Sequence, residues 1–194
     1  MPNKRGKRVN PRRIPMAKSA FDPAAVMNEE SYGNRYYGWV LVLHAMLEQG
    51  IKTADEIKRI WDAANGAVLH LTLKSWEIHD AEQLMGLKEP YPHLDPRRVR
   101  SEAEAAVYRR KARENATFLA LCSIALGLEA SGMVDHAEQR RIFSNAALTL
   151  AEIENGCCSY KQLAGEIMRH GLVIEQTEED IYLQATDKSV PSSV

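Results

Sequence analysis

The fold of this chain is decided by one apolar run, Tyr36-Tyr37-Gly38-Trp39-Val40-Leu41-Val42-Leu43-His44-Ala45-Met46-Leu47. A helix that is apolar nearly all round is buried at the centre of a bundle or at a contact between subunits. Asp22-Pro23 indicates its start, because an N-cap acid followed by proline is favoured at a helix N-terminus, and Gly50 indicates its end. We therefore expect one long buried helix from residue 23 to residue 50.

Two shorter helices are expected next. Thr53 and Glu56 form a capping box, and the apolar residues that follow fall on one helical face. Residues 69–73 alternate as a short strand would, but no partner strand is evident, so we expect the helix to continue. A third helix is expected from Ser75 to about residue 87.

The second half of the chain repeats this order. Residues 88–98 contain three prolines and predict a linker or a stiff crossing loop. Ser101 and Glu104 form another capping box, which begins a long helix that ends at Gly132. Helices are expected over about 134–154 and 159–170, and the last dozen residues are expected to be frayed.

The two halves align with each other at a shift of 82 residues. Over positions 50–64, five of 15 residues are identical: Gly50 with Gly132, Glu56 with Glu138, Arg59 with Arg141, Ile60 with Ile142 and Ala64 with Ala146. Conservative pairs lie between them, among them Lys58 with Arg140 and Trp61 with Phe143. Self-similarity at a fixed spacing indicates an internal duplication.

These observations predict an all-α fold, a six-helix bundle built from two duplicated three-helix modules. We expect the long helices to pack together about a pseudo-twofold axis, and a homodimer that shares this core is the alternative arrangement. The predicted divisions are a basic N-terminal arm (1–20), module 1 (21–87), a Pro-rich linker (88–98), module 2 (99–184) and a flexible tail (185–194).

Charge is distributed unevenly along the 194 residues. The formal net charge is −1, yet residues 1–18 contain seven basic residues and no acidic one. The remainder carries 18 Lys and Arg against 26 Asp and Glu, a charge of about −8. This balance argues against a protein that coats nucleic acid over its whole surface. The arm is either a solubilising tail or a segment that binds phosphates or an acidic groove.

The amino-acid composition also indicates the cellular compartment in which we expect the protein. Three cysteines form no disulfide framework, and an odd count is typical of a reducing environment. The longest uncharged runs are too short to span a bilayer, and no apolar segment follows the basic N-terminal stretch as in a secretory signal. We expect a cytoplasmic protein with no contact with a membrane.

The stretch Asn10-Pro11-Arg12-Arg13-Ile14-Pro15, followed by a long apolar helix, a glycine stop and a second helix with Trp61, resembles a known group. These are short helical proteins encoded by bacteriophages and prophages of Gram-positive bacteria, and the resemblance covers residues 10–87. This chain departs from them by its second module and its linker. The resemblance implies a viral accessory protein in the cytoplasm of a bacterial host that acts by binding, and it brings no catalytic residues.

Few residue patterns point to chemistry. Cys157 and Cys158, with His170 and His136, have soft ligand atoms, but adjacent cysteines do not match the spacing of structural zinc sites. We expect no metal and no cofactor. His44, within the apolar run, is expected to be a hydrogen-bonded core histidine. No triad, nucleophile elbow or phosphate-binding glycine loop is evident, so we expect no enzyme activity.

The best candidate site is the polar half of each long helix. The expected ligand-binding residues are Asn28, Tyr32, Arg35 and Tyr36 in module 1 and Tyr108, Arg109 and Arg113 in module 2. Guanidinium groups beside aromatic rings suit a phosphate with a base, or a hot spot for a protein partner. The alternative is a solvated face with i,i+4 pairs such as Arg110 with Glu114. Arg8, Arg12 and Arg13 are the expected contacts of the arm.

The sequence therefore favours a non-enzymatic phage accessory protein that inhibits a host-defence component. It would sequester a nucleotide signal or block a defence protein, as a monomer or a homodimer. The alternative is a nucleic-acid-binding regulator that uses the basic arm and the cluster Arg97–Arg113.

Overall fold

The computed structural model describes residues 23–50, 52–68, 75–91, 95, 99, 101–177 and 180–186, without the side chains of 23–34, 67, 68, 75, 76 and 102. The expected basic arm, the alternating segment 69–73, much of the Pro-rich linker and residues 187–194 lie outside this description.

The expectation of a mostly helical chain is confirmed. Six helices are described: α1 (Pro23–Glu48), α2 (Ala54–Val68), α3 (Ser75–Met85), α4 (Glu102–Ser131), α5 (His136–Glu154) and α6 (Tyr160–Arg169). Two strands follow, β1 (Leu172–Gln176) and β2 (Ile181–Ala185). As far as the structure describes the helices, none combines the length and the apolar character that crossing a membrane requires.

Local side-chain contacts explain where the helices begin and end. The Oγ1 atom of Thr53 accepts a bond from the amide of Glu56 (3.3 Å), and a carboxylate oxygen of Glu56 accepts one from the amide of Thr53 (2.8 Å). This reciprocal pair satisfies two amides that the first turn of α2 leaves open. Ser101, Asp135 and Ser159 cap α4, α5 and α6 in the same position.

The all-helical expectation for module 2 is wrong at its end, where two strands follow α6. Residues 172–176 and 181–185 pair as two antiparallel strands, with Leu172 opposite Ala185 and Gln176 opposite Ile181. Leu172, Ile174, Ile181 and Leu183 are buried, so residue 183 is not part of a frayed end. The signal was an alternation of apolar and polar residues on both sides of Thr177, which is the period of a half-buried strand.

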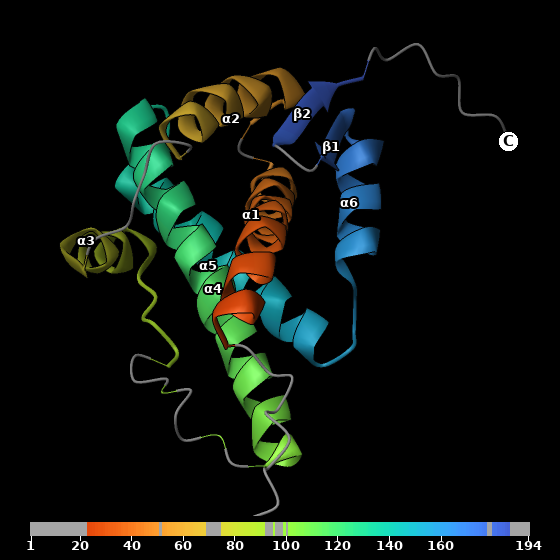
Figure 1. Ribbon diagram of the computed structural model, residues 1–194. Helices are drawn as coiled ribbons and strands as arrows, with labels where there is room; N and C mark the ends of the chain where they lie inside the picture. Colours follow the sequence, from red (N-terminus) through yellow and green to blue (C-terminus); the bar gives the residue numbers. More distant parts are fainter. Residues whose placement is uncertain are drawn as a thin grey trace, which may run out of the picture.

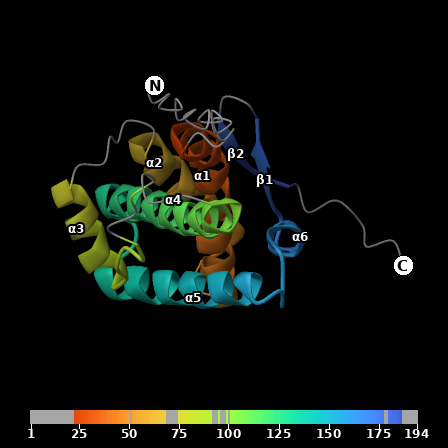
Figure 2. The same ribbon diagram turned by 60° about the horizontal axis from the view of Figure 1, so that its bottom comes forward.

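The element α1 lies at the centre of the molecule. It contacts α4, α5 and α6, whereas its contact with the neighbouring α2 is small. Similarly, α4 contacts α2 and α3 extensively and α5 only slightly. Figures 1 and 2 show α1 crossing α4, with α5 beneath and α6 and the hairpin on the far side of α1 from α3. Each long helix therefore packs mainly against elements from the other half of the chain.

The crossing of the two long helices depends on Gly38. A Cβ atom placed on Gly38 would lie 3.3 Å from the Cβ of Ala120 and 3.2 Å from Cδ1 of Ile124. These distances are at the lower limit of van der Waals contact, so only the smallest residues allow the backbones to approach this closely.

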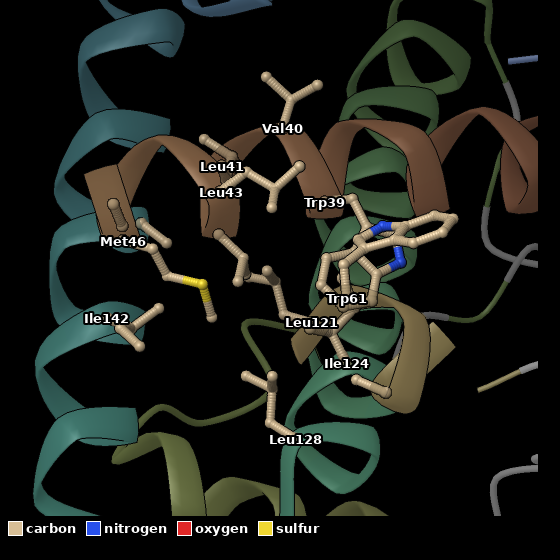
Figure 3. Close-up of a cluster of buried hydrophobic side chains, with 14 of the residues drawn as sticks. Trp39, Val40, Leu41, Leu43, Met46, Trp61, Leu121, Ile124, Leu128 and Ile142 are labelled. Atoms are coloured by element: carbon tan, nitrogen blue, oxygen red, sulfur yellow. The ribbon is translucent and has the colours of Figure 1, made fainter. Parts of the chain in front are cut away.

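The core fills the space around this crossing. Trp39, on α1, and Trp61, on α2, have ring centroids 5.9 Å apart, and Trp39 is fully buried. Figure 3 shows Leu121 and Ile124 of α4 near Trp61 and Leu128 further along α4, with Met46 on the same side of the core as Ile142 of α5. Side chains from four helices thus share one core, as the all-round apolar character of α1 requires.

Candidate functional site

Arg35, expected to bind a ligand, is engaged inside the fold. Its Nη2 atom donates to Oδ1 of Asn65 on α2 (3.0 Å) and to Oδ1 of Asp180 before β2 (2.9 Å). The same Asp180 oxygen also accepts a bond from the amide of Ile181 (2.8 Å). The hydrogen bonds of Arg35 therefore connect α1 with α2 and with the residue that precedes β2.

The other module 1 candidates have different surroundings. Tyr36 is half-buried and packs edge-on against Tyr37, with ring centroids 5.6 Å apart, and burial raises the pKa of its hydroxyl. Tyr37 in turn packs against Tyr160 of α6. Asn28 and Tyr32 belong to α1, but their side chains lie outside the described part of the chain, as do the arm residues Arg8, Arg12 and Arg13.

The module 2 candidates lie in the first half of α4. Tyr108 is only 6% exposed, and burial raises the pKa of its hydroxyl. Arg109 is half-buried and Arg113 is exposed, and all three side chains take part in interactions within the protein. A buried ring is not available for stacking on a base in this conformation.

The polar half of α4 also carries a segment of the expected linker. Asn115 accepts a bond from the amide of Tyr91 (3.0 Å) and donates to the carbonyl of the same residue (2.8 Å). The ammonium group of Lys111 lies 4.9 Å from the centroid of the Tyr91 ring, a cation–π distance. This part of α4 is therefore covered by residues 89–91.

The structure shows the surroundings of the histidine and cysteine residues that the sequence analysis considered. His44 is a buried, hydrogen-bonded histidine as expected, with Nε2 at 2.8 Å from Oε2 of Glu166 on α6. Cys122 lies in the core, where burial raises the pKa of its thiol to about 12. Within the ranges that the structure describes, no group of three or more His, Cys, Asp or Glu side chains is arranged to hold a metal ion.

Sequence reasoning missed a polar hollow of about 410 Å³ beside the end of α1. It is lined by Gln49 and by four residues of α5: Arg140, Arg141, Ser144 and Asn145. Arg140 and Arg141 are exposed, and Arg140 Nη2 lies 3.5 Å from the carbonyl oxygen of Gln83 at α3. Both polar atoms of the Gln49 carboxamide are buried without a hydrogen-bond partner. The lining is rich in hydrogen-bond donors and includes no carboxylate.

The electrostatics of this hollow are set by the two arginines. Asp135, the N-cap of α5, has its pKa lowered mainly by the backbone amide of Glu138, with a smaller contribution from Arg141. Lys52 is paired with Glu138 at 3.4 Å and is not part of the lining. Among the described side chains, Arg141 has no carboxylate within ion-pair distance. The hollow therefore offers two guanidinium groups to an incoming anion.

A consecutive basic pair is the signal in the sequence that could have pointed to this hollow. Arg140 and Arg141 align with Lys58 and Arg59 in the first half, and this alignment indicates duplication but no binding role. The hollow also needs Gln49, which directly follows α1 and is distant from α5 in the sequence. Neither a scan against protein-family models nor searches of curated proteins and of solved structures found a match.

Proposed function

We propose that this chain is a non-enzymatic binding protein that inhibits a component of a bacterial defence system, as an accessory protein of a phage or prophage. The biological setting rests on the resemblance of residues 10–87 to such proteins. The binding role rests on the hollow formed by Gln49, Arg140, Arg141, Ser144 and Asn145, which we call the Arg140 hollow.

The observation that carries the proposal is a donor-rich hollow in an acidic body. Residues 19–194 hold an excess of about eight acidic residues, yet two exposed guanidinium groups meet here with no carboxylate in the lining. Guanidinium groups bind carboxylates and phosphates with two parallel hydrogen bonds. The hollow therefore suits an anionic group of a partner, either the phosphate of a nucleotide signal or an acidic group of a defence protein.

We also propose that the architecture is duplicated. At a shift of 82 residues, Ala54, the first residue of α2, corresponds to His136, the first residue of α5. Gly50 and Gly132 both have positive φ, 59° and 62°. Gly38 corresponds to Ala120, and these two residues meet where the long helices cross. Equivalent residues meet in this way at a pseudo-twofold axis.

An infection assay tests the inhibitory role. The full chain, expressed in a bacterial host that carries a defence system, is expected to restore plaque formation by a phage that the system restricts. The double variant Arg140→Gln with Arg141→Gln is expected to lose this effect, whereas Arg59→Gln, an exposed arginine on α2, is expected to keep it. Restoration that is equal in both variants would separate inhibition from the Arg140 hollow.

Native mass spectrometry of the protein purified from bacteria distinguishes the two modes of inhibition. A nucleotide signal is expected as a small bound mass, and a defence protein as a complex of defined stoichiometry. Light scattering on the same sample reports whether the chain is a monomer or a homodimer.

Nucleic-acid regulation is the second candidate function, because residues 1–18 contain seven basic residues and no acid. It predicts DNA or RNA binding that weakens steeply with salt and is lost when residues 1–18 are deleted. Binding that survives this deletion contradicts the proposed role of the arm.

A further inference from the structure

Two basic pairs, Lys58-Arg59 on α2 and Arg140-Arg141 on α5, occupy equivalent positions, but only the first contains a cation that is paired with a carboxylate of its own helix. In the first half, Lys58 forms an ion pair with Asp62, four residues further along α2. In the second half, Arg140 and Ser144 hold these two positions. A carboxylate four residues from a cation on a helix is its nearest neighbour. Serine at position 144 leaves Arg140 without a carboxylate four residues further along α5. Arg140 and Arg141 are therefore available to an anionic ligand.

The groups around the Arg140 hollow suit one class of anion. Two arginines, a glutamine, an asparagine and a serine line it. Together they present many more donors than a single carboxylate accepts, whereas a terminal phosphate has three oxygens that accept bonds from several directions. The buried carboxamide of Gln49 has no hydrogen-bond partner among the described residues, and a buried polar group without a partner is unfavourable.

We infer that the Arg140 hollow is a binding site for a phosphate monoester, the terminal phosphate of a small molecule. This inference rests on the proposed binding role of the same hollow and names the chemical class of its ligand. A hollow of about 410 Å³ falls in the range of small-molecule sites, roughly 300–1,000 Å³. None of its lining residues is aromatic, so the phosphate group, and not a stacked base, supplies the recognition.

Calorimetric titration of the full chain tests this assignment. The probes are ribose 5-phosphate, adenosine monophosphate, inorganic phosphate and, as the uncharged control, ribose. We expect the two monoesters to bind with similar affinities and ribose not to bind. A base contribution that strengthens adenosine monophosphate by more than about tenfold over ribose 5-phosphate would overturn recognition by phosphate alone.

The discriminating variant introduces the acid of the first half into the second. Ser144→Asp places a carboxylate four residues after Arg140, where it pairs with the guanidinium group and repels the ligand. We expect it to weaken ribose 5-phosphate binding by at least about tenfold, since hydrogen bonds to charged groups contribute enough for such a factor. Arg141→Gln is expected to have a similar effect, and Arg141→Lys a smaller one.

The matched control is Arg59→Gln, the equivalent position to Arg141 on α2, which is expected to bind as the unaltered chain does. The three substituted positions, Arg59, Arg141 and Ser144, are all exposed, and circular dichroism of each variant verifies its fold. Ser144→Asp binding as tightly as the unaltered chain, or no monoester binding in the millimolar range, would overturn the inference. Monoester binding without any effect on infection supports this inference and contradicts the proposed function. An effect on infection without monoester binding supports the proposed function and contradicts this inference.

Discussion

At Gly38 a single hydrogen in place of a side chain allows two long helices to cross. The nearest atoms to a Cβ at this position belong to Ala120 and Ile124 of α4, at 3.3 and 3.2 Å. The glycine weakens α1 by roughly 1 kcal/mol relative to alanine, and close packing of the two backbones offsets that cost. The sequence indicated that Gly38 permits close contact or marks a break, and the structure decides for close contact.

A larger residue at this crossing is expected to destabilise the fold. Gly38→Leu adds a branched side chain where less than one carbon fits, and overpacking of this kind costs about 1–3 kcal/mol. The matched change is Gly66→Ala on α2, where a Cβ meets nothing within 4 Å and helix propensity favours alanine by roughly 0.5–1 kcal/mol. Urea unfolding is expected to shift in opposite directions for the two variants. A midpoint for Gly38→Leu equal to that of the unaltered chain contradicts this account of the crossing.

Arg35, a predicted ligand-binding residue, has partners in the structure that the local sequence does not indicate. In the sequence it stands near Tyr32 and Tyr36, which suggested a ligand site. In the structure its guanidinium group is held by Asp180, 145 residues away, and by Asn65. No local pattern contains that acid, so only the folded chain reveals the pairing.

At the scale of elements, helix boundaries follow from contacts within three or four residues. Ser101, Asp135 and Ser159 each accept a bond from the amide three residues further on. Such contacts satisfy amides that the first turn leaves without partners. The helix starts expected at Ser101 and Ser159 are therefore confirmed, and α5 begins two residues after the expected position of about 134.

The Asp135 cap predicts a pH dependence of stability. The backbone amide of Glu138 holds the pKa of Asp135 below its ordinary value of 3.8. A carboxyl group whose pKa is lower in the folded state stabilises the fold above its unfolded pKa, and this contribution is lost as the pH falls through the folded pKa. Asp135→Asn keeps a capping oxygen but removes the charge. We therefore expect the unaltered chain to be more stable than Asp135→Asn at pH 7, with a difference that disappears in strong acid.

Thermal unfolding at several pH values measures this difference. The comparison with Ser159→Ala, an uncharged cap, serves as the control, because its effect on α6 is expected to be independent of pH. A constant difference between the unaltered chain and Asp135→Asn from pH 7 to strong acid contradicts the assigned role of the charge.

The hairpin is the element that sequence reasoning missed. Its strands are five residues each, and a two-stranded hairpin alone is marginally stable in water. Its stability depends on packing of β2 against α2 and on the bond between Asp180 and Arg35. Both contacts are distant in sequence, so the alternation in residues 172–183 is informative only when those partners are known.

At the scale of the whole molecule, each long helix packs against the shorter helices of the other half of the chain. The first long helix packs on α5 and α6, and the second packs on α2 and α3. Neither long helix is covered mainly by its own half. Burial of apolar surface is the dominant favourable term in folding, so separating the halves would expose α1 and α4 together.

This packing between the halves predicts a single cooperative unfolding transition. Tryptophan fluorescence reports Trp39 and Trp61 at the shared core together with Trp76 of α3, whereas circular dichroism reports all helices. In a denaturant titration we expect the two signals to change with the same midpoint, because loss of one half removes the cover of the other. Two separate midpoints would indicate independent modules and contradict this packing between the halves.

The sequence by itself determined where most of the helices begin and end and that the second half of α1 would be buried, because caps, glycine stops and an apolar run act over a few residues. Only the tertiary structure decided that each long helix packs against the other half, that Arg35 faces inward and that Gln49 meets Arg140 and Arg141. The physical reason is distance along the chain. Gln49 and Arg140, and Arg35 and Asp180, are about 90 and 145 positions apart, and the pairing of such distant groups depends on how all the helices fill one core.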